Sequence, residues 1–434
     1  MTKHRVLSLL VASAFDPTAS HGVNAAPVVL YQLLSALAAQ PDITVKFLRV
    51  GQLTTDTQES RDTRQNLEEQ GVAFLEPLCL SNAKPSKRAI VSRLLSPLAT
   101  DYYPIIEQSA AANQRVADIA PDALLIPWSE TLTALFSEAP TVRVAYYGNP
   151  DPKNLMAQGV VARKSGRWAY WALWSLLRRQ LTHFHLSTMT RYHAIGDVAA
   201  NDAEYYRRQG HPNAFYVPNI WLDRFGSTWP EMRDKLEATA SFRIVGNIGR
   251  QSATANTLGM DLLGARILPR LAEIMRDKIE SYEVDILGAG KSISWVQHTL
   301  MRPEVRLLGF VDDIDHHLLS SHVVLCANNG SVYNVGHTRY LHAWSLGCCL
   351  VLHQNARLAM PEISHGVNAL LGESPEHMAE LTKEALYDKA LRRRLGEGGY
   401  ETFLSRFTAR PVGTILADLI RSTVTQTTEL TSRS

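Results

Sequence analysis

Arg339 and His342 are the residues whose types and spacing first suggest chemistry, since both can donate to an anion and they stand one helical turn apart. The apolar stretches 322–327 and 348–352 are typical of buried strands. The segment between them predicts a glycine-containing loop and then a helix over about 338–346. Backbone N–H groups and the positive end of the helix dipole meet at the start of such a helix. The segment therefore predicts a phosphate site beside the carboxyl end of a strand.

Polar residues follow apolar runs in the same way in the N-terminal half. Glu130 comes after the run 123–127, and Asn149 and Asp151 come after the run 142–147. In an open parallel sheet the carboxyl ends of the strands face the ligand, so these residues are candidates for binding an acceptor. Helix caps and turns use the same residue types, and that interpretation stays open.

The first loop of the chain connects a strand expected over 5–12 to a helix expected over about 26–39, as in a Rossmann-like unit. Gly22 in this loop lets the backbone approach a ligand at the helix start, and the alternative is a plain turn glycine. The basic residues and apolar run of 1–14 also resemble a short signal peptide. The loop and helix that follow favour the strand.

Length and composition limit the class of protein. With 434 residues the chain has material for two or three domains, and its 45% hydrophobic and 20% charged residues are ordinary for a globular protein. A net charge of +2 argues against a surface built as a whole for a polyanion. The four cysteines lack metal-ligand spacing and indicate reduced thiols, so we expect a cytoplasmic protein without a bound metal. No run is long enough for a membrane-spanning helix.

The segment 153–191 places a tryptophan-rich run between basic clusters. Trp168, Trp171 and Trp174 stand in this run. A basic, tryptophan-rich helix suits a membrane surface with anionic lipids, which predicts a peripheral contact through 163–179 at the inner face of a membrane. We prefer a core helix with solvated basic ends, because apolar residues occur nearly all round the helix. Nucleic acid is a third class of partner, which we do not expect without a recognised binding module.

The segment 334–347 resembles the donor-binding half of nucleotide-sugar glycosyltransferases with the GT-B fold, in particular glycosyltransferase family 4, or glycosyl transferases group 1. That family carries a Glu, seven residues, and a second Glu followed by Ala, a hydrophobic residue, a small residue and Gly. His342 stands at the second Glu and Asn334 at the first, so this chain replaces both carboxylates. Arg339 stands where a variant of the family has Lys.

Further motifs extend the resemblance over about 242–371. Residues 217–223, VPNIWLD, are similar to the family's junction between its two domains. Arg250 stands where the family has an Arg for the donor diphosphate, although it also suits a solvated loop residue, and the Lys-Gly pair that follows in the family is Leu258-Gly259 here. Residues 305–314 match the segment whose backbone reads the nucleotide base.

The resemblance implies a functional site in which Arg250, Arg339 and His342 act as the catalytic set. In that site His342 would lie near the nucleotide ribose and the two arginines at the diphosphate. It also implies a donor site formed by Gly22, Gly249, Gly288, Gly290, Phe310, Val311, Asn334, Gly336, His337 and Thr338, the last of which can cap the helix. The loop after the first strand adds to the acceptor candidates, which are then His21, Asn24, Glu130, Asn149 and Asp151.

The fold implied is α/β of the GT-B type, with two Rossmann-like domains facing each other across a cleft. Residues 1–225 form the acceptor domain and residues 226–410 the nucleotide-sugar domain, with a polar linker over 227–241. Residues 411–434 form a last helix that crosses back to the first domain, followed by a polar tail.

The leading hypothesis is a glycosyltransferase, class EC 2.4, that moves a sugar from a nucleotide diphosphate sugar to a hydroxyl of a glycan or lipid-linked acceptor in polysaccharide or glycolipid biosynthesis. Cationic side chains and a helix start would stabilise the leaving group without a metal, and the resemblance implies retention of configuration. The competing hypothesis is a non-catalytic GT-B module that binds a nucleotide sugar or a glycan or lipid partner. A GT-B enzyme with other chemistry, such as epimerisation, is a third option without a specific signal.

Overall fold

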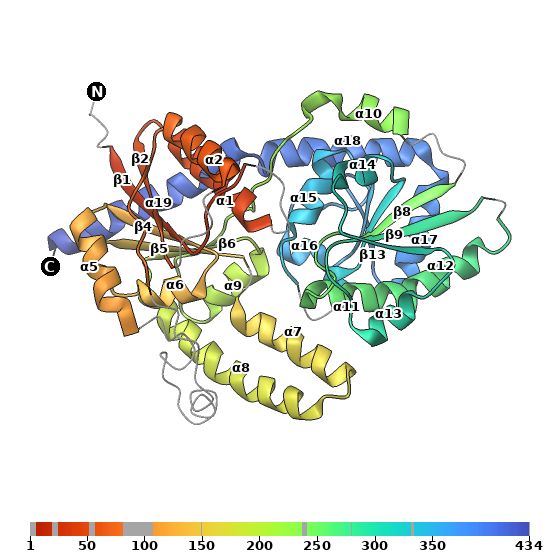
Figure 1. The fold of residues 1–434 in the computed structure, drawn as a ribbon, viewed down its shortest axis with the longest axis horizontal. Helices are drawn as coiled ribbons and strands as arrows, with labels where there is room; N and C mark the ends of the chain where they lie inside the picture. The colour runs from red at the N-terminus through yellow and green to blue at the C-terminus, as the bar shows by residue number, and fades with distance from the viewer. Residues whose placement is uncertain are drawn as a thin grey trace. The chain divides into compact units, whose positions relative to one another are not determined.

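The structure is a computed structural model that describes residues 6–19, 25–51, 57–80, 107–148, 150–236, 241–278, 280–330 and 334–433. The chain divides into two compact units, each built round one parallel sheet (Figure 1). Unit 1 comprises Met1–Met156, Ala169–Ile220 and Ala409–Ser434, and unit 2 comprises Ala157–Trp168 and Trp221–Thr408.

The described part of unit 1 contains a sheet of seven parallel strands in the order β3-β2-β1-β4-β5-β6-β7. The inner strands are short apolar runs that are largely buried, as parallel strands covered on both faces require, while the edge strands β3 and β7 are partly exposed. The strands are β1 (Leu7–Ser13), β2 (Ile43–Arg49), β3 (Val72–Phe74), β4 (Ala123–Pro127), β5 (Val142–Tyr147), β6 (Ala194–Asp197) and β7 (Ala214–Tyr216). These positions confirm the strands predicted from the apolar runs.

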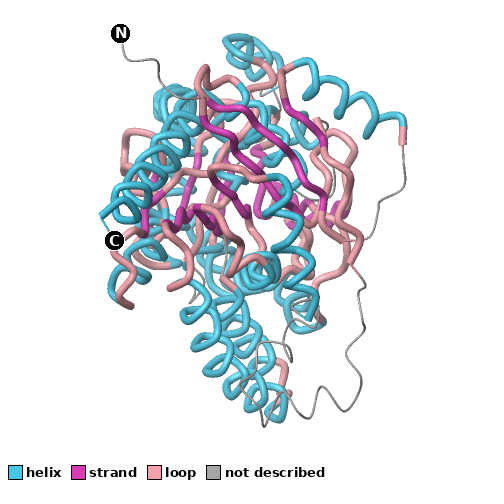
Figure 2. The backbone as a smooth tube through the Cα atoms, turned by 90° about the vertical axis from the view of Figure 1, so that its left-hand side faces the viewer, coloured by secondary structure: helices cyan, strands magenta, loops and turns pink. Residues whose placement is uncertain are grey.

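Helices connect these strands and enclose the sheet (Figure 2). They are α1 (Ala25–Ala38), α2 (Gln58–Glu69), α5 (Ser109–Ile119), α6 (Glu130–Leu135), α7 (Asp151–Lys164), α8 (Trp168–Met189), α9 (Ala200–Arg208) and α19 (Ala409–Arg433). Although α19 comes last in the chain, it packs on α1, where Gly413 allows close approach to Ala36. Arg421 of α19 also pairs with Asp42.

The described part of unit 2 contains a six-stranded parallel sheet in the order β10-β9-β8-β11-β12-β13. Its core joins residues of the central strands, such as Ile244 and Val351, to helix residues such as Leu271 and Leu395. The strands are β8 (Phe242–Asn247), β9 (Tyr282–Leu287), β10 (Val305–Gly309), β11 (Val323–Cys326), β12 (Leu350–His353) and β13 (Leu370–Gly372).

The helices of unit 2 include short 3₁₀ and π segments. They are η2 (Gly226–Thr228), α10 (Trp229–Leu236), α11 (Thr254–Leu262), η3 (Leu263–Ile267), α12 (Leu268–Met275), α13 (Ser294–Leu300), α14 (Ile314–Leu319), η4 (Asn328–Gly330), α15 (Thr338–Ser345), α16 (Ala356–Ala359), α17 (Pro375–Tyr387) and α18 (Lys389–Arg406). The second half of α7 joins this unit, because Ala157 packs with Leu258 and Val335.

Two predicted segments differ from the structure. The expected linker over 227–241 contains the helix α10, whose Trp229 and Arg233 lie one turn apart and are both buried. The polar tail predicted at the end of 411–434 belongs to the last helix, which continues through a threonine-rich stretch to Arg433. Between α11 and α12 the π segment η3 ends just before Pro269, which lacks the N–H that an uninterrupted helix would use.

The preferred interpretation of the tryptophan-rich segment as a core helix is wrong for the first half of α8. Trp168, Tyr170, Trp171 and Leu176 are exposed. The buried residues of α8 belong to its second half and are Leu181, His185, Thr188 and Met189. Apolar residues all round a helix predict burial, but the first half of α8 presents them to solvent.

Candidate functional site

The centre of the sheet in unit 2 is the point where its strand order reverses. The central strands β8 and β11 are neighbours, while the chain continues from β8 to β9 on one side and from β11 to β12 on the other. In open α/β sheets, ligands bind beyond the carboxyl ends of the strands at such a point. Asn247 is the last residue of β8, and Asn328 follows β11.

The guanidinium of Arg339, in the first turn of α15, lies among three asparagine side chains at this point. Its Nη1 donates to Oδ1 of Asn328 at 3.0 Å and to Oδ1 of Asn247 at 3.4 Å, and its Nη2 donates to Oδ1 of Asn256. We call Asn247, Asn256 and Asn328 the asparagine cradle. These amides orient the guanidinium and carry no net charge, so they do not neutralise its positive charge.

Close packing between α11 and the loop after β11 holds the cradle together. Nδ2 of Asn328 donates to the carbonyl of Ala255 at 3.1 Å and to Oδ1 of Asn256 at 3.2 Å. A Cβ on Gly259 would lie 2.9 Å from Nδ2 of Asn328, so only glycine permits this approach. Nδ2 of Asn256 donates to the carbonyl of Arg250 at 2.7 Å, which links the loop after β8 to the cradle.

Two predicted glycine turns meet beside the cradle. Gly249 and Gly288 both have positive φ values, of 99° and 126°, which favour glycine. A Cβ on Gly288 would lie 1.8 Å from the carbonyl oxygen of Gly249, and the amide of Gly288 donates to the carbonyl of Gly309 at 2.6 Å. Gly290, with φ at 84°, continues the second turn. The loops after β8, β9 and β10 are therefore in direct contact.

The loop that leads into α15 brings several predicted donor residues next to Arg339. Asn334 and Gly336 are half-buried, and His337 is buried with its Nε2 2.9 Å from Oδ1 of Asn329. His337 occupies the cap position, and no side chain caps α15. The prediction that Thr338 caps the helix is wrong, because Thr338 is already its first residue. Among the described residues, no side chain caps the N–H groups of this first turn.

His342 lies one turn further along α15 in a buried polar network. Its Nε2 is 2.5 Å from Oδ1 of Asp315, and Oδ2 of Asp315 accepts from Arg224. The ring of Trp221 lies over that of His342, with a centroid distance of 5.4 Å. This nitrogen of His342 is thus committed to a carboxylate of α14, and the predicted contact with a ribose stays a prediction.

The remaining candidates of unit 2 are more exposed. Arg250 and Phe310 are exposed in the loops after β8 and β10, and Val311 is half-buried. Their roles at the diphosphate and the base stay predictions.

The predicted acceptor residues belong to unit 1, and the structure describes part of them. Glu130 begins α6 after the cap residue Ser129, whose hydroxyl accepts from the amide of Leu132 at 3.2 Å. Asp151 begins α7. The residues His21, Gly22, Asn24 and Asn149 lie outside the described residues.

A buried ionic cluster in unit 1 was not predicted. Nζ of Lys153 donates to both carboxylate oxygens of Asp202, at 2.7 and 2.6 Å. Asp197, the last residue of β6, is fully buried, and its Oδ1 accepts from the amide of Ala199 at 2.8 Å. Burial raises the pKa of Asp197 well above its usual value, and the neighbouring Asp202 raises it further. The carboxyl end of β6 therefore favours a protonated aspartic acid.

The asparagine cradle was also absent from the sequence-based set of site residues. Asn247 ends an apolar run, and Asn328 follows one, so both stood where a ligand-facing residue is expected. Asn256 gave no such signal, since asparagine near a helix start usually reads as a cap or turn.

Residues 242–388 match the family model described as Glycosyl transferases group 1. No curated protein matches the chain in sequence.

Solved structures of glycosyltransferases match along nearly the whole chain. Sucrose-phosphate synthase from Thermosynechococcus elongatus matches with 14% identity and a TM-score of 0.62, over 99% of this chain and 100% of that one. The α,α-trehalose 6-phosphate synthase from Burkholderia multivorans matches with 13% identity and a TM-score of 0.62, over 99% of each chain. HepE from Anabaena, in complex with UDP and glucose, matches with 12% identity and a TM-score of 0.60, over 96% of this chain and 100% of that one.

At these identities the structural likeness shows the fold, which is GT-B, and the family match assigns residues 242–388 to a known type of domain. The chain thus has a GT-B fold and carries, over residues 242–388, a glycosyl transferases group 1 domain, a domain of a glycosyltransferase family of class EC 2.4.

Proposed function

We propose that the enzyme binds the diphosphate of a nucleotide sugar at Arg339 and transfers the sugar to a hydroxyl of a glycan or lipid-linked acceptor. The observation that carries this proposal is the position of Arg339, which three neutral amides hold at the centre of the sheet in unit 2. The start of α15, which has no side-chain cap, adds N–H donors beside the same charge.

The proposed chemistry depends on stabilising the leaving group. As the bond between the anomeric carbon and the phosphate oxygen breaks, negative charge builds up on the nucleoside diphosphate, and the acceptor oxygen forms the new bond to the same carbon. A guanidinium already oriented by its neighbours stabilises this charge without reorganising. Arg339 and the first N–H groups of α15 would do so without a metal ion, and the family match favours retention of configuration.

The donor to test first is a UDP-sugar, because HepE was solved with UDP and with UDP-glucose. A thermal-shift screen with UDP-, GDP-, ADP- and dTDP-sugars identifies the nucleotide, since a ligand that binds only the folded state raises the melting temperature. We then expect that donor to release the free nucleoside diphosphate when an acceptor is supplied. Binding of the donor with no release under any acceptor would instead favour a module that binds without turnover.

We further propose that the first half of α8 contacts an anionic membrane surface, which would bring the enzyme to lipid-linked acceptors. Trp168 is 58% exposed, and Tyr170, Trp171 and Leu176 are exposed on the same helix. Arg178 and Arg179 are exposed next to them, and α8 contains no acidic residue. Aromatic rings prefer the membrane interface, and basic side chains attract anionic lipids. Among the helices described, none is long and apolar enough to cross a membrane.

A further inference from the structure

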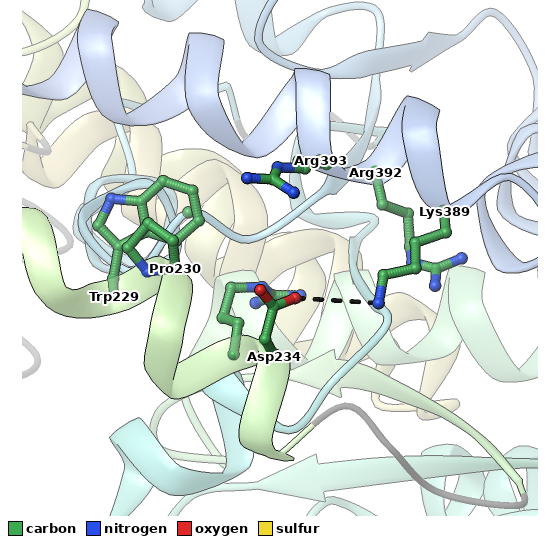
Figure 3. A pocket seen from close by; sticks show the side chains of 8 residues that line it. Trp229, Pro230, Asp234, Lys389, Arg392 and Arg393 are labelled. Atoms are coloured by element: carbon green, nitrogen blue, oxygen red, sulfur yellow. Dashed lines mark ion pairs between the residues drawn. The ribbon is translucent and has the colours of Figure 1, made fainter.

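A small pocket lies on unit 2 between α10 and the start of α18 (Figure 3). Gly347, which follows α15, forms part of its wall. Arg233 of α10 bonds to the carbonyls of Leu318 and Ser321, which precede β11. The pocket therefore lies at the amino-end edge of the sheet, opposite the edge where Arg339 and the asparagine cradle lie.

Positive charge dominates the lining of this pocket. Four lining residues are cationic and one, Asp234, is acidic. Arg233 and Arg392 are buried, with only 6% and 7% of their surfaces exposed. Arg233 donates to the two carbonyls and to the sulfur of Cys348, and no carboxylate among the described residues pairs with it. A buried guanidinium whose acceptors are all neutral keeps its full charge next to the pocket.

The other two cations, Lys389 and Arg393, are exposed at the pocket mouth. Nζ of Lys389 lies 3.8 Å from Oδ1 of Asp234, an ion pair marked by the dashed line in Figure 3. Nε of Arg393 lies 3.1 Å from Oε1 of Glu397 on the same helix. These exposed pairs are weak, because water and salt screen them. In Figure 3 the guanidinium of Arg393 extends between α18 and the side chains of Trp229 and Pro230.

The position of these cations on α18 conflicts with the usual charge pattern of a helix. Lys389 is its first residue, and Arg392 and Arg393 follow within the next turn. The one carboxylate described at this helix start is that of the N-cap residue Asp388, which accepts from the amide of Leu391 at 2.8 Å. Cations at a helix start are unfavourable, because the dipole is positive there. Asp388 supplies one negative charge to this helix start, and a bound anion would balance the three cations that follow it.

We propose that this pocket binds a phosphate group, either inorganic phosphate or the phosphate of a small phosphomonoester. The buried guanidinium of Arg233 and the side chains of Lys389 and Arg393 supply the donors, and the fork geometry of arginine suits phosphate oxygens. This site is separate from the proposed donor site, and α15 joins the two, with Arg339 in its first turn and Gly347 just beyond its end.

Phosphate titration followed by isothermal calorimetry tests this site. The measurements use the full chain carrying Arg339→Gln, so that the donor site does not contribute, with sodium chloride matched in ionic strength as the reference. We expect phosphate binding that chloride does not reproduce. The double variant Lys389→Gln, Arg393→Gln in the same background should bind phosphate at least about tenfold more weakly, since it lacks two charge-assisted contacts.

Arg394→Gln is the matched control, because Arg394 is exposed on the same helix and does not line the pocket. It should leave phosphate affinity unchanged. A titration with glycerol phosphate in place of inorganic phosphate shows whether the pocket binds a phosphomonoester or inorganic phosphate more tightly. Phosphate binding no stronger than chloride, or an equal loss in Arg394→Gln, would overturn the proposal. A normal melting temperature of the double variant excludes unfolding as the cause of its weaker binding.

Discussion

Arg339 is half-buried, and the amide oxygens of the asparagine cradle fix the direction of its guanidinium. Orientation matters for catalysis because a charge that is already in place does not have to reorganise when the leaving group forms. The amides do this without neutralising the charge. Carboxylates at the same positions would form ion pairs with Arg339 and reduce its attraction for a diphosphate.

Asn256→Ala should weaken nucleotide binding although residue 256 need not touch the ligand. The substitution removes an acceptor of Arg339 and the link to the carbonyl of Arg250. We expect the Kd for the nucleoside diphosphate to rise about 5- to 10-fold, as a lost hydrogen bond to a charged group predicts. Calorimetry measures this change, with Asn66→Ala on α2 as the control. Unchanged affinity in Asn256→Ala would show that the cradle does not position Arg339.

His185 should make unit 1 less stable in acid. Burial lowers its pKa from 6.5 to about 4, and its Nε2 lies 3.1 Å from the hydroxyl of Tyr206. The unfolded chain takes up the proton at a higher pH than the folded chain. The contribution of His185 to the free energy of unfolding is therefore complete above pH 6.5 and is lost as the pH falls towards 4.

The variant His185→Gln should therefore lose less stability than the wild type between pH 7 and pH 5. For one titrating group, the free energy of unfolding changes by at most about 1.4 kcal/mol per pH unit. Denaturant unfolding at the two pH values measures the difference. Equal losses in both proteins would mean that His185 does not titrate as its burial implies.

Single residues of the site were predictable where the local pattern was strong. Gly249 and Gly288 stood after apolar runs, and the structure brings these two glycines into contact. The direction of a side chain is not contained in the spacing, so the commitment of His342 to Asp315 was not foreseen. The partners of Arg339 come from three separate segments, which only the folded sheet brings together.

At the scale of elements, α18 shows how packing overrides helix propensity. This helix contains Gly396, Gly398 and Gly399. A Cβ on Gly396 would lie 2.2 Å from the carbonyl oxygen of Gly347, and one on Gly399 would lie 2.3 Å from the ring of Trp344. The glycines thus allow α18 to approach α15, the helix that carries Arg339.

Gly396→Ala should destabilise the protein despite the better helix propensity of alanine. The gain in propensity is about 1 kcal/mol, whereas forcing a methyl group against a backbone carbonyl costs about 1–3 kcal/mol or more. We expect a lower melting temperature. Glu401→Ala, on the exposed face of the same helix, should change it little. A higher melting temperature for Gly396→Ala would contradict the close contact between the two helices.

The exposed aromatic residues of α8 should be required for binding to anionic vesicles. The double variant Trp168→Ala, Trp171→Ala should lose most of the flotation of the full-length protein with vesicles that contain phosphatidylserine or phosphatidylglycerol. Phe215→Ala, which removes an exposed ring from β7, serves as the control. Absence of wild-type binding to these vesicles, or equal binding by the double variant, would refute the membrane contact.

Most elements could be predicted because apolar runs of strand length and 3.6-residue periodicity are strong signals. The predictions were wrong for segments in which tertiary packing outweighs composition. Polar composition concealed α10, although its Trp229 and Arg233 are buried. Helix α19 continues through Thr425 and Thr428, whose hydroxyls bond back to the carbonyls four residues earlier. Such side-chain bonds are not visible as a periodic pattern.

At the scale of the whole molecule, the two units repeat one plan. In each described sheet the first strand is central, the next strands add on one side, and the chain then crosses to the other side. This plan follows from parallel strands joined by crossover helices, so the α/β class was predictable from the alternation of elements. The more specific GT-B assignment rested on motifs within 242–371 and on the comparisons.

The family's two glutamates are absent from this chain, where Asn334 and His342 stand in their place. Leaving-group stabilisation is given to Arg339 and the start of α15, while a buried histidine and aspartate pair occupies the second glutamate position. The proposed stabilisation of the leaving group therefore depends on whether Arg339 contacts the diphosphate.

Calorimetric titration of nucleoside diphosphates, UDP first and then GDP, ADP and dTDP, tests this claim most directly. The proteins compared are the wild type, Arg339→Gln and the control Arg276→Gln, an exposed arginine after α12. The account predicts that Arg339→Gln raises the Kd about 10- to 100-fold, as the loss of charge-assisted hydrogen bonds to phosphate implies, and that the control leaves it unchanged. The same Kd in all three proteins, or no binding of any nucleoside diphosphate to the wild type, would contradict it.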